Sequence, residues 1–147
     1  MRFEESSVTL RVRPNDLDSL GHVNNATVLE YLEAGRWAWM DQHGLGRQSP
    51  VIGVVSRIEV DYRREIRPQQ EVEVRTRLES PGPEDLADED ATHYRATFWQ
   101  QVLVEGQVAT EARVQAAFLH VADRTLASLQ DFLKAASFPS PSGRGPG

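Results

Sequence analysis

The sequence lacks cysteine altogether and has no long apolar run. Without cysteine, disulfide scaffolds, thiol nucleophiles and cysteine-based zinc sites are excluded. No stretch approaches the roughly 20 apolar residues that a membrane-spanning helix requires. The N-terminal sequence MRFEESSV also lacks the apolar core of a signal peptide. We therefore expect a cytoplasmic protein that does not associate with membranes.

Positive charge is also scarce. Lysine and arginine together number 16, against 22 aspartates and glutamates, which gives a formal net charge of −6. Nucleic-acid binding depends on cationic surface, so nucleic acid is not an expected partner. The four histidines, at positions 22, 43, 93 and 120, lack a spacing typical of metal ligands. Phosphate-binding and dinucleotide-binding glycine motifs are missing as well, so we predict neither a metal nor a cofactor.

The chain does have the length and composition of one globular domain. It comprises 147 residues, of which 39% are hydrophobic, and soluble domains most often have about 100–150 residues. Residues 137–147 are rich in proline, glycine and serine, a composition typical of disordered segments. We predict a single folded domain over residues 1–136 and a disordered tail over residues 137–147.

One long helix is predicted at residues 26–43. Its apolar side chains occupy most of the helical circumference, which is typical of a buried helix. Asn24 or Asn25 is the expected N-cap, and Gly44 is the expected terminator. We expect this helix to lie in the core of the domain.

The rest of the domain consists mainly of predicted strands. Apolar and polar residues alternate with a period of two in residues 6–13, 54–64, 70–80, 92–104 and 107–121. Glu105-Gly106 is a typical hairpin turn, residues 81–91 are predicted to form an acidic loop, and residues 126–136 a short helix. We therefore predict an α+β fold, a curved antiparallel sheet of about five strands wrapped around one central helix. The exposed face and edges of such a sheet need cover from another copy.

The loop before the long helix concentrates side chains that can carry chemistry. They are Asp16, Asp18, His22, Asn24 and Asn25. The first N–H groups of a helix lack intrahelical partners and lie at the positive end of its dipole, so they can stabilise an oxyanion. A carboxylate held nearby can attack a carbonyl or activate water. The same residue types also shape turns and cap helices, and both interpretations stay open on physical grounds alone.

The amino-acid sequence of this loop resembles that of a known family. The sequence RPNDLDSLGHVNN, residues 13–25, followed by YLEAGR, residues 31–36, is similar to the signature of hotdog-fold acyl thioesterases of the 4-hydroxybenzoyl-CoA thioesterase-like branch. The DLD and HVNN segments also resemble acyl-ACP thioesterases of plants. IEVDY and IRP, within residues 58–68, look like the second strand of that family and its exit. The resemblance covers residues 6–122 and implies a hotdog fold.

The resemblance implies roles for individual residues. Asp18 matches the catalytic carboxylate of the family, which acts as a nucleophile or as a general base for water. The backbone N–H of Asn25 falls where the family polarises the thioester carbonyl. His22 matches the histidine of the plant-type motif, which orients or polarises water. Leu20 departs from the plant pattern, in which this position is a catalytic asparagine.

Three further residues are secondary candidates. Glu33 is a reserve catalytic residue, because some hotdog thioesterases act through a helix glutamate, but its spacing from Arg36 also favours a structural ion pair. Asn24 and Arg57 are predicted to contact the substrate. Arg57, like Arg63, Arg64 and Arg67, could bind coenzyme A phosphates or belong to a solvated, salt-bridged strand face.

The resemblance therefore implies a thioesterase that hydrolyses acyl-CoA or acyl-carrier-protein thioesters without a cofactor. Because the active site of this family lies at a dimer interface, we expect a homodimer or homotetramer. One alternative is a hotdog-fold enoyl-thioester hydratase or dehydratase, which also pairs an acid with a histidine. Another is a non-catalytic acyl-thioester-binding protein, such as a ligand sensor.

Overall fold

The computed structural model describes residues 3–45, 49–68 and 70–134. Its elements are, in chain order, β1 (Ser6–Arg11), η1 (Pro14–Asp16), α1 (Asn25–Gln42), β2 (Val51–Tyr62), β3 (Glu71–Ser80), α2 (Pro83–Ala87), β4 (Arg95–Val104), β5 (Gln107–His120), β6 (Leu126–Ala127) and α3 (Leu129–Leu133). The tail predicted at residues 137–147 lies outside the described residues, as do the last two residues of the helix predicted at 126–136.

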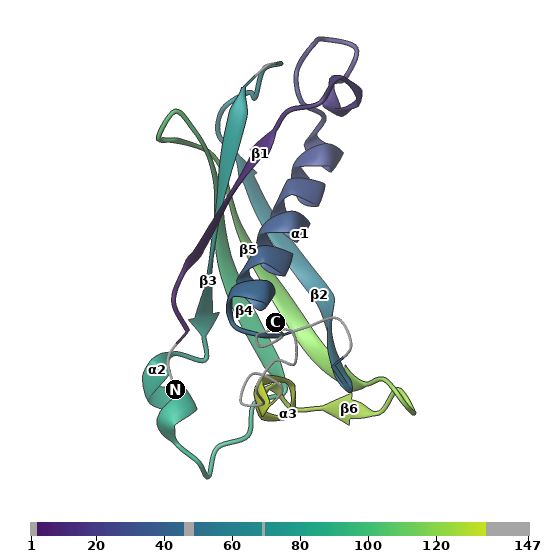
Figure 1. Ribbon diagram of the computed structural model, residues 1–147, viewed down its shortest axis with the longest axis vertical. Coiled ribbons are helices and arrows are strands. Elements are labelled where there is room, and N and C mark those ends of the chain that lie inside the picture. The colour runs from purple at the N-terminus through teal and green to yellow at the C-terminus, as the bar shows by residue number, and fades with distance from the viewer. Residues whose placement is uncertain (1–2, 46–48, 69, 135–147) are drawn as a thin grey trace, which may run out of the picture.

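The strands form one antiparallel sheet in the order β1-β3-β4-β5-β2, and the short β6 pairs with the end of β5. The sheet curves around α1, which packs mainly against β1, β3 and β4 (Figure 1). The predicted turn between β4 and β5 is present, with positive φ angles of 52° at Glu105 and 79° at Gly106, as a two-residue hairpin requires. The predicted α+β hotdog architecture, a curved antiparallel sheet around a central helix, is confirmed.

The central helix begins and ends close to its predicted bounds. The Asn24 side chain accepts a hydrogen bond from the backbone N–H of Ala26 at 2.8 Å, so Asn24 is the N-cap and Asn25 is the first helical residue. His43 is the C-cap, and Gly44 follows with a φ of +74° that ends the helix. Capping by Asn24 fixes the point at which the preceding loop meets the first turn of α1.

Two clusters of buried side chains fix α1 against the sheet. One surrounds Leu32 and Val74, and the other surrounds Trp39 and Phe118 and includes side chains of α3. All four residues are at most 1% exposed. Because both clusters are tightly buried, the N-terminal end of α1 is held in a defined position relative to the sheet.

Two segments differ from the sequence-based expectation. Residues 81–91, predicted as a loop, contain α2, which starts at Pro83 and has two carboxylates in its first turn, where proline and negative charge both favour a helix. Residues 126–136, predicted as one helix, begin instead with β6. The helix α3 starts only after Ser128, whose side chain forms a capping box with Asp131.

The edge strand β2 is left uncovered by α1. Its register with β5 sets Ile58, Val60 and Tyr62 on the same face as buried residues of β5, as the alternation predicts. Ile58 and Tyr62 are nevertheless 36% and 44% exposed, because α1 packs over β1, β3 and β4 and does not extend to β2 at the edge of the sheet. Within the described part of the chain β2 pairs with β5 alone. An apolar face and a strand edge are therefore open here.

Candidate active site

The loop before α1 is organised by the buried carboxylate of Asp16, which is 3% exposed. It accepts hydrogen bonds from the Tyr31 hydroxyl at 2.6 Å and from the Arg13 backbone N–H at 2.8 Å, and the Arg13 guanidinium lies 3.1 Å away. Burial alone would raise the pKa of Asp16, but these donors outweigh it and lower the pKa. The Asp16 carbonyl also accepts a hydrogen bond from Asn24 at 2.8 Å. Asp16 therefore ties the loop to α1.

Asp18, two residues on, has a partly exposed carboxylate with one engaged oxygen. Its Oδ1 accepts hydrogen bonds from the backbone N–H groups of Leu20 at 2.9 Å and His22 at 3.1 Å. A tight turn at Gly21, with a φ of +82°, brings these two groups together. The N–H of His22 and then that of Leu20 hold the pKa of Asp18 below its usual value. No hydrogen bond to Oδ2 is found among the described residues, so this oxygen is available for chemistry.

Asn25 presents the first amide of α1. The side chain of the preceding residue, Asn24, accepts a hydrogen bond from the N–H of Ala26. Within the described ranges no acceptor is found for the N–H of Asn25. The carbonyl of Asn25 accepts a hydrogen bond from the Tyr62 hydroxyl at 3.1 Å. The first turn of the helix is thus anchored to the end of β2, while its leading N–H is available to a ligand.

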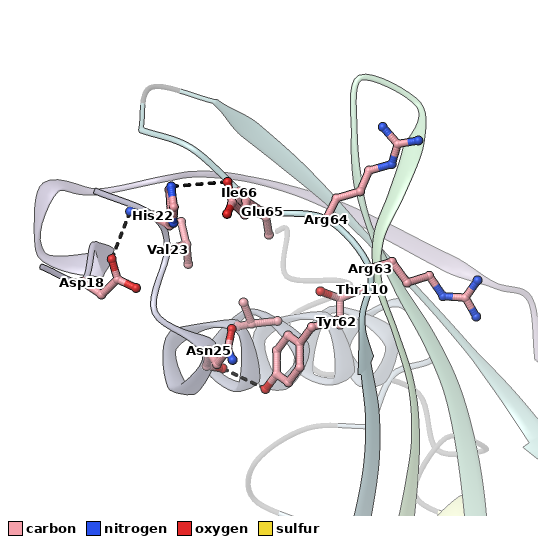
Figure 2. Close-up of a pocket in the computed structure, with 11 residues that line it drawn as sticks. Asp18, His22, Val23, Asn25, Tyr62, Arg63, Arg64, Glu65, Ile66 and Thr110 are labelled. Carbon is pink, nitrogen blue, oxygen red and sulfur yellow. Dashed lines mark hydrogen bonds and ion pairs between the residues drawn. The ribbon is translucent and has the colours of Figure 1, made fainter. Parts of the chain in front are cut away.

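Asp18 and Asn25 line the same pocket, which has a volume of about 300 Å³. Figure 2 shows Asp18 on one side, Tyr62 with the following arginines on the other, and Asn25 at the start of α1 between them. The lining residues are Asp18, His22, Val23, Asn25, Val28, Tyr62, Arg63, Arg64, Glu65, Ile66 and Thr110. Asp18, whose Oδ2 has no hydrogen bond among the described residues, and Asn25, the first residue of α1, therefore line one cavity. A carboxylate and a helix N-terminus are groups that acyl transfer can use.

His22 also lines this pocket, and its imidazole is paired with a carboxylate. Its Nε2 lies 3.3 Å from Oε2 of Glu65, and the neighbouring N–H of Val23 donates to the carbonyl of Ile66 at 2.8 Å. These contacts join the loop before α1 to the segment after β2 (Figure 2). His22 therefore lies beside Asp18 with an orientation set by Glu65.

The other predicted site residues lie elsewhere. Glu33 borders a separate groove of about 630 Å³ between β1 and α1, whose lining does not include Asp18. Arg57 belongs to β2, where it lies 3.5 Å from Glu59, and it does not line the Asp18 pocket. Asn24 acts as the helix cap next to the pocket. The structure thus brings Asp18, His22 and Asn25 together, without Glu33 or Arg57.

Sequence reasoning did not identify the residues that β2 and β5 contribute to the site. Tyr62 and Thr110 face each other across these strands at the pocket, and partial burial raises the pKa of the Tyr62 hydroxyl. Alternation does predict that Tyr62 points toward the inner face. The contact with Asn25 joins residues 37 positions apart, however, and no local pattern reports it.

The described residues offer no group of three or more histidine, aspartate or glutamate side chains arranged to hold a metal ion. The chemistry of the pocket is that of a carboxylate, an imidazole and backbone amides. In the same ranges, no helix is both long and apolar enough to span a membrane.

Comparison with known proteins identifies the family of this chain. A family model described as the thioesterase-like superfamily matches residues 12–139. A hypothetical protein from Thermus thermophilus has a TM-score of 0.75 and 24% identity, with 91% of this chain and 96% of that chain covered. A DHNA-CoA thioesterase from Staphylococcus aureus has a TM-score of 0.74 and 17% identity, with 90% and 89% covered.

A predicted thioesterase from Bacillus stearothermophilus is also similar, with a TM-score of 0.72, 22% identity, and 89% of this chain and 92% of that chain covered. At these identities the solved structures establish the fold alone. No curated protein matches the sequence. The family model covers most of the chain, and it includes the Asp18 loop, α1 and the whole sheet apart from β1. The chain therefore belongs to the thioesterase-like superfamily, with the hotdog fold.

Proposed function

We propose that this protein hydrolyses acyl thioesters, with Asp18 as the catalytic carboxylate and the Asn25 N–H as the oxyanion donor. The observation that carries the proposal is the shared pocket, which is lined both by Asp18 and by Asn25, the first residue of α1. The available Oδ2 of Asp18 supports attack on a carbonyl carbon. The positive end of the helix dipole favours the negative charge that then develops on the carbonyl oxygen.

We assign Asp18 the nucleophilic role because two backbone N–H groups hold its Oδ1, which leaves Oδ2 to reach a carbonyl carbon. The lowered pKa keeps the carboxylate ionised at neutral pH, as a nucleophile and a general base both require. In the proposed reaction Oδ2 attacks the thioester carbonyl, the C–S bond breaks, and the thiolate leaves and is protonated by solvent. Water then hydrolyses the mixed anhydride, which releases the acid and restores Asp18.

We propose coenzyme A esters as the substrates. Two structural neighbours, from Staphylococcus aureus and Synechocystis, are described as DHNA-CoA and 1,4-dihydroxy-2-naphthoyl-CoA thioesterases. Both descriptions name a coenzyme A thioester, and the Synechocystis one names the thioester of a dihydroxylated aromatic acid. A panel of aromatic, short-chain and long-chain acyl-CoA esters, together with acyl-carrier-protein esters, distinguishes the possible acyl groups and carriers.

We also propose that the active form is at least a homodimer. The apolar face and free edge of β2 lie next to the pocket, and Ile58 and Tyr62 are exposed there. Exposed strand edges and apolar patches are commonly covered by a second copy. Light scattering at micromolar concentration is expected to give two or four times the monomer mass of 16.5 kDa. An active monomer would contradict this proposal.

Release of free thiol from the acyl-CoA panel tests the proposed hydrolysis. Asp18→Asn is expected to lower kcat by about a thousandfold or more without loss of the fold. Asp61→Asn, which changes a carboxylate on the exposed opposite side of β2, is the matched control. Glu33→Gln is expected to affect turnover far less than Asp18→Asn, because Glu33 borders another groove. An Asp18→Asn variant with nearly normal turnover would refute the proposal.

Three measurements address the remaining alternatives. After a single turnover in H₂¹⁸O, label in the Asp18 side chain establishes a mixed anhydride that water opens at the Asp18 carbonyl. Label in the released acid alone is expected both from a general base and from an anhydride opened at the acyl carbonyl. Hydration of enoyl-CoA without thiol release would indicate a hydratase. Acyl-CoA affinity without any turnover would indicate a binding protein.

A further inference from the structure

Arg64, which has no ion-pair partner among the described residues, borders the pocket on the side opposite Asp18. The backbone N–H groups of Arg63 and Arg64 both donate to the carbonyl of Ala109, at 2.8 and 3.1 Å. These two hydrogen bonds to one carbonyl fix the backbone of the two arginines that follow β2. Figure 2 shows their side chains diverging, with the Arg64 guanidinium directed outward from the pocket.

The two arginines differ in their electrostatic partners. Arg63 lies 2.7 Å from the carboxylate of Glu111, so its charge is largely neutralised. No carboxylate lies within ion-pair distance of Arg64 among the described residues. The nearest acidic residue in sequence, Glu65, is already 3.3 Å from His22. In a chain with a net charge of −6, Arg64 is thus a cation at the pocket rim that is available for an external anion.

We propose that Arg64 binds a phosphate of the thiol carrier of the substrate. The inference rests on the proposed function. Thioester carriers share a pantetheine arm whose far end is a phosphate, as a diphosphate in coenzyme A and as a phosphodiester on a carrier protein. When Asp18 and Asn25 hold the thioester, this arm has to leave the pocket, and the outward direction of Arg64 suits a group at its far end. A planar guanidinium binds phosphate oxygens in bidentate fashion.

The proposal also selects one of the four arginines that the sequence offers for the phosphates. Arg57, the predicted contact, lies 3.5 Å from Glu59 and outside the pocket. Arg64 is the lining arginine without a carboxylate partner in the described part of the chain. Position and charge therefore favour Arg64 over both Arg57 and Arg63.

Thioesters that differ only in their phosphates test this assignment. Arg64→Met is expected to raise KM for an acyl-CoA about tenfold, the effect of losing one charge-assisted hydrogen bond. Arg64→Lys keeps the positive charge and is expected to raise KM by less. KM for the same acyl group on phosphate-free pantetheine is expected to stay unchanged. Arg113→Met is the control, because Arg113 lies 3.0 Å from Glu79 and away from the pocket.

The acyl-4′-phosphopantetheine ester identifies the phosphate. A rise in its KM with Arg64→Met assigns the contact to the phosphate that both carriers share, and acyl-carrier protein is then affected as well. A rise confined to acyl-CoA assigns the contact to the phosphates that only coenzyme A carries. An equal rise for the pantetheine ester, or no rise for any ester, would overturn the proposal.

Binding of coenzyme A itself, measured by calorimetry, needs no turnover. Wild-type protein is expected to bind it with a salt-dependent affinity that Arg64→Met lowers about tenfold. If binding behaves in this way while no thioester is cleaved, the proposed hydrolysis fails and the phosphate contact stands. A change of oligomeric state caused by Arg64→Met would instead make Arg64 an interface residue and refute the contact.

Discussion

Replacing Asn25 by proline isolates the proposed oxyanion donor. Proline has no N–H, and the first position of a helix tolerates it, because its N–H has no intrahelical partner there. Asn25 occupies this first position in α1. The preceding residue, Asn24, has φ −62° and ψ 137°, which is the extended conformation that proline imposes on the residue before it. The substitution therefore removes one donor while the backbone keeps its shape.

The structure sets the expected magnitude. Asn24 caps Ala26 and not Asn25, and the Tyr62 hydroxyl bonds to the carbonyl of residue 25, so neither contact is lost. The free energy of unfolding is expected to stay constant or to rise by about 0.4–1 kcal/mol, because proline restricts the unfolded chain. Loss of one oxyanion donor is expected to lower kcat by about 10²–10³.

Steady-state thiol release and urea unfolding together provide the assay. Asn25→Ala retains the N–H and is the matched control, with kcat expected within a few-fold of the wild-type value. An ester in place of the amide bond before residue 25 removes the N–H without adding the proline ring, and it is expected to reproduce the loss of turnover. A folded Asn25→Pro variant that works at nearly the normal rate would refute the role of this amide.

Three further predictions concern stability and pH. Gly35→Ala is expected to lower the free energy of unfolding by about 1–2 kcal/mol in urea titrations, because the new Cβ would overlap the fully buried Val74 and overpacking outweighs the gain in helix propensity. An unchanged urea midpoint would contradict the close approach of the Gly35 backbone to Val74. Tyr31→Phe removes the 2.6 Å hydrogen bond to Asp16 and is expected to cost about 1.5–3 kcal/mol at neutral pH. Since the pKa of Asp16 is lowered in the folded protein, ionised Asp16 stabilises the fold fully above its unfolded pKa of about 3.9, and this stabilisation is lost as the pH falls through the folded pKa. Calorimetric melting across pH 2–7 is therefore expected to show a smaller loss of stability at acid pH in Tyr31→Phe than in the wild type. Because the pKa of Asp18 is also lowered, kcat/KM is expected to be level between about pH 5 and 7, and an acid limb inside that range would show that another group controls turnover.

Local patterns were sufficient for the central helix and for much of the loop that precedes it. Asn24 and Gly44 bound α1 because capping and termination depend on a few adjacent residues. The Asp18 turn and the Asn25 amide lie within eight positions of each other, so the sequence spacing alone brings them close. The short elements α2 and β6 were missed. The formation of β6 depends on pairing with β5, which no local pattern expresses.

Periodicity in the sequence determined an α+β pattern of strands and one buried helix, and the resemblance of the loop before this helix implied the hotdog class. Short-range spacing made Asp18, His22 and Asn25 neighbours and restricted the helix N-cap to Asn24 or Asn25. Only the tertiary structure decided what surrounds them. The packing of α1 turns Glu33 into a different groove, and the register of β2 brings Tyr62 to Asn25 across 37 residues. Such contacts depend on long-range strand register and helix packing, in which side chains distant in sequence compete for the same space.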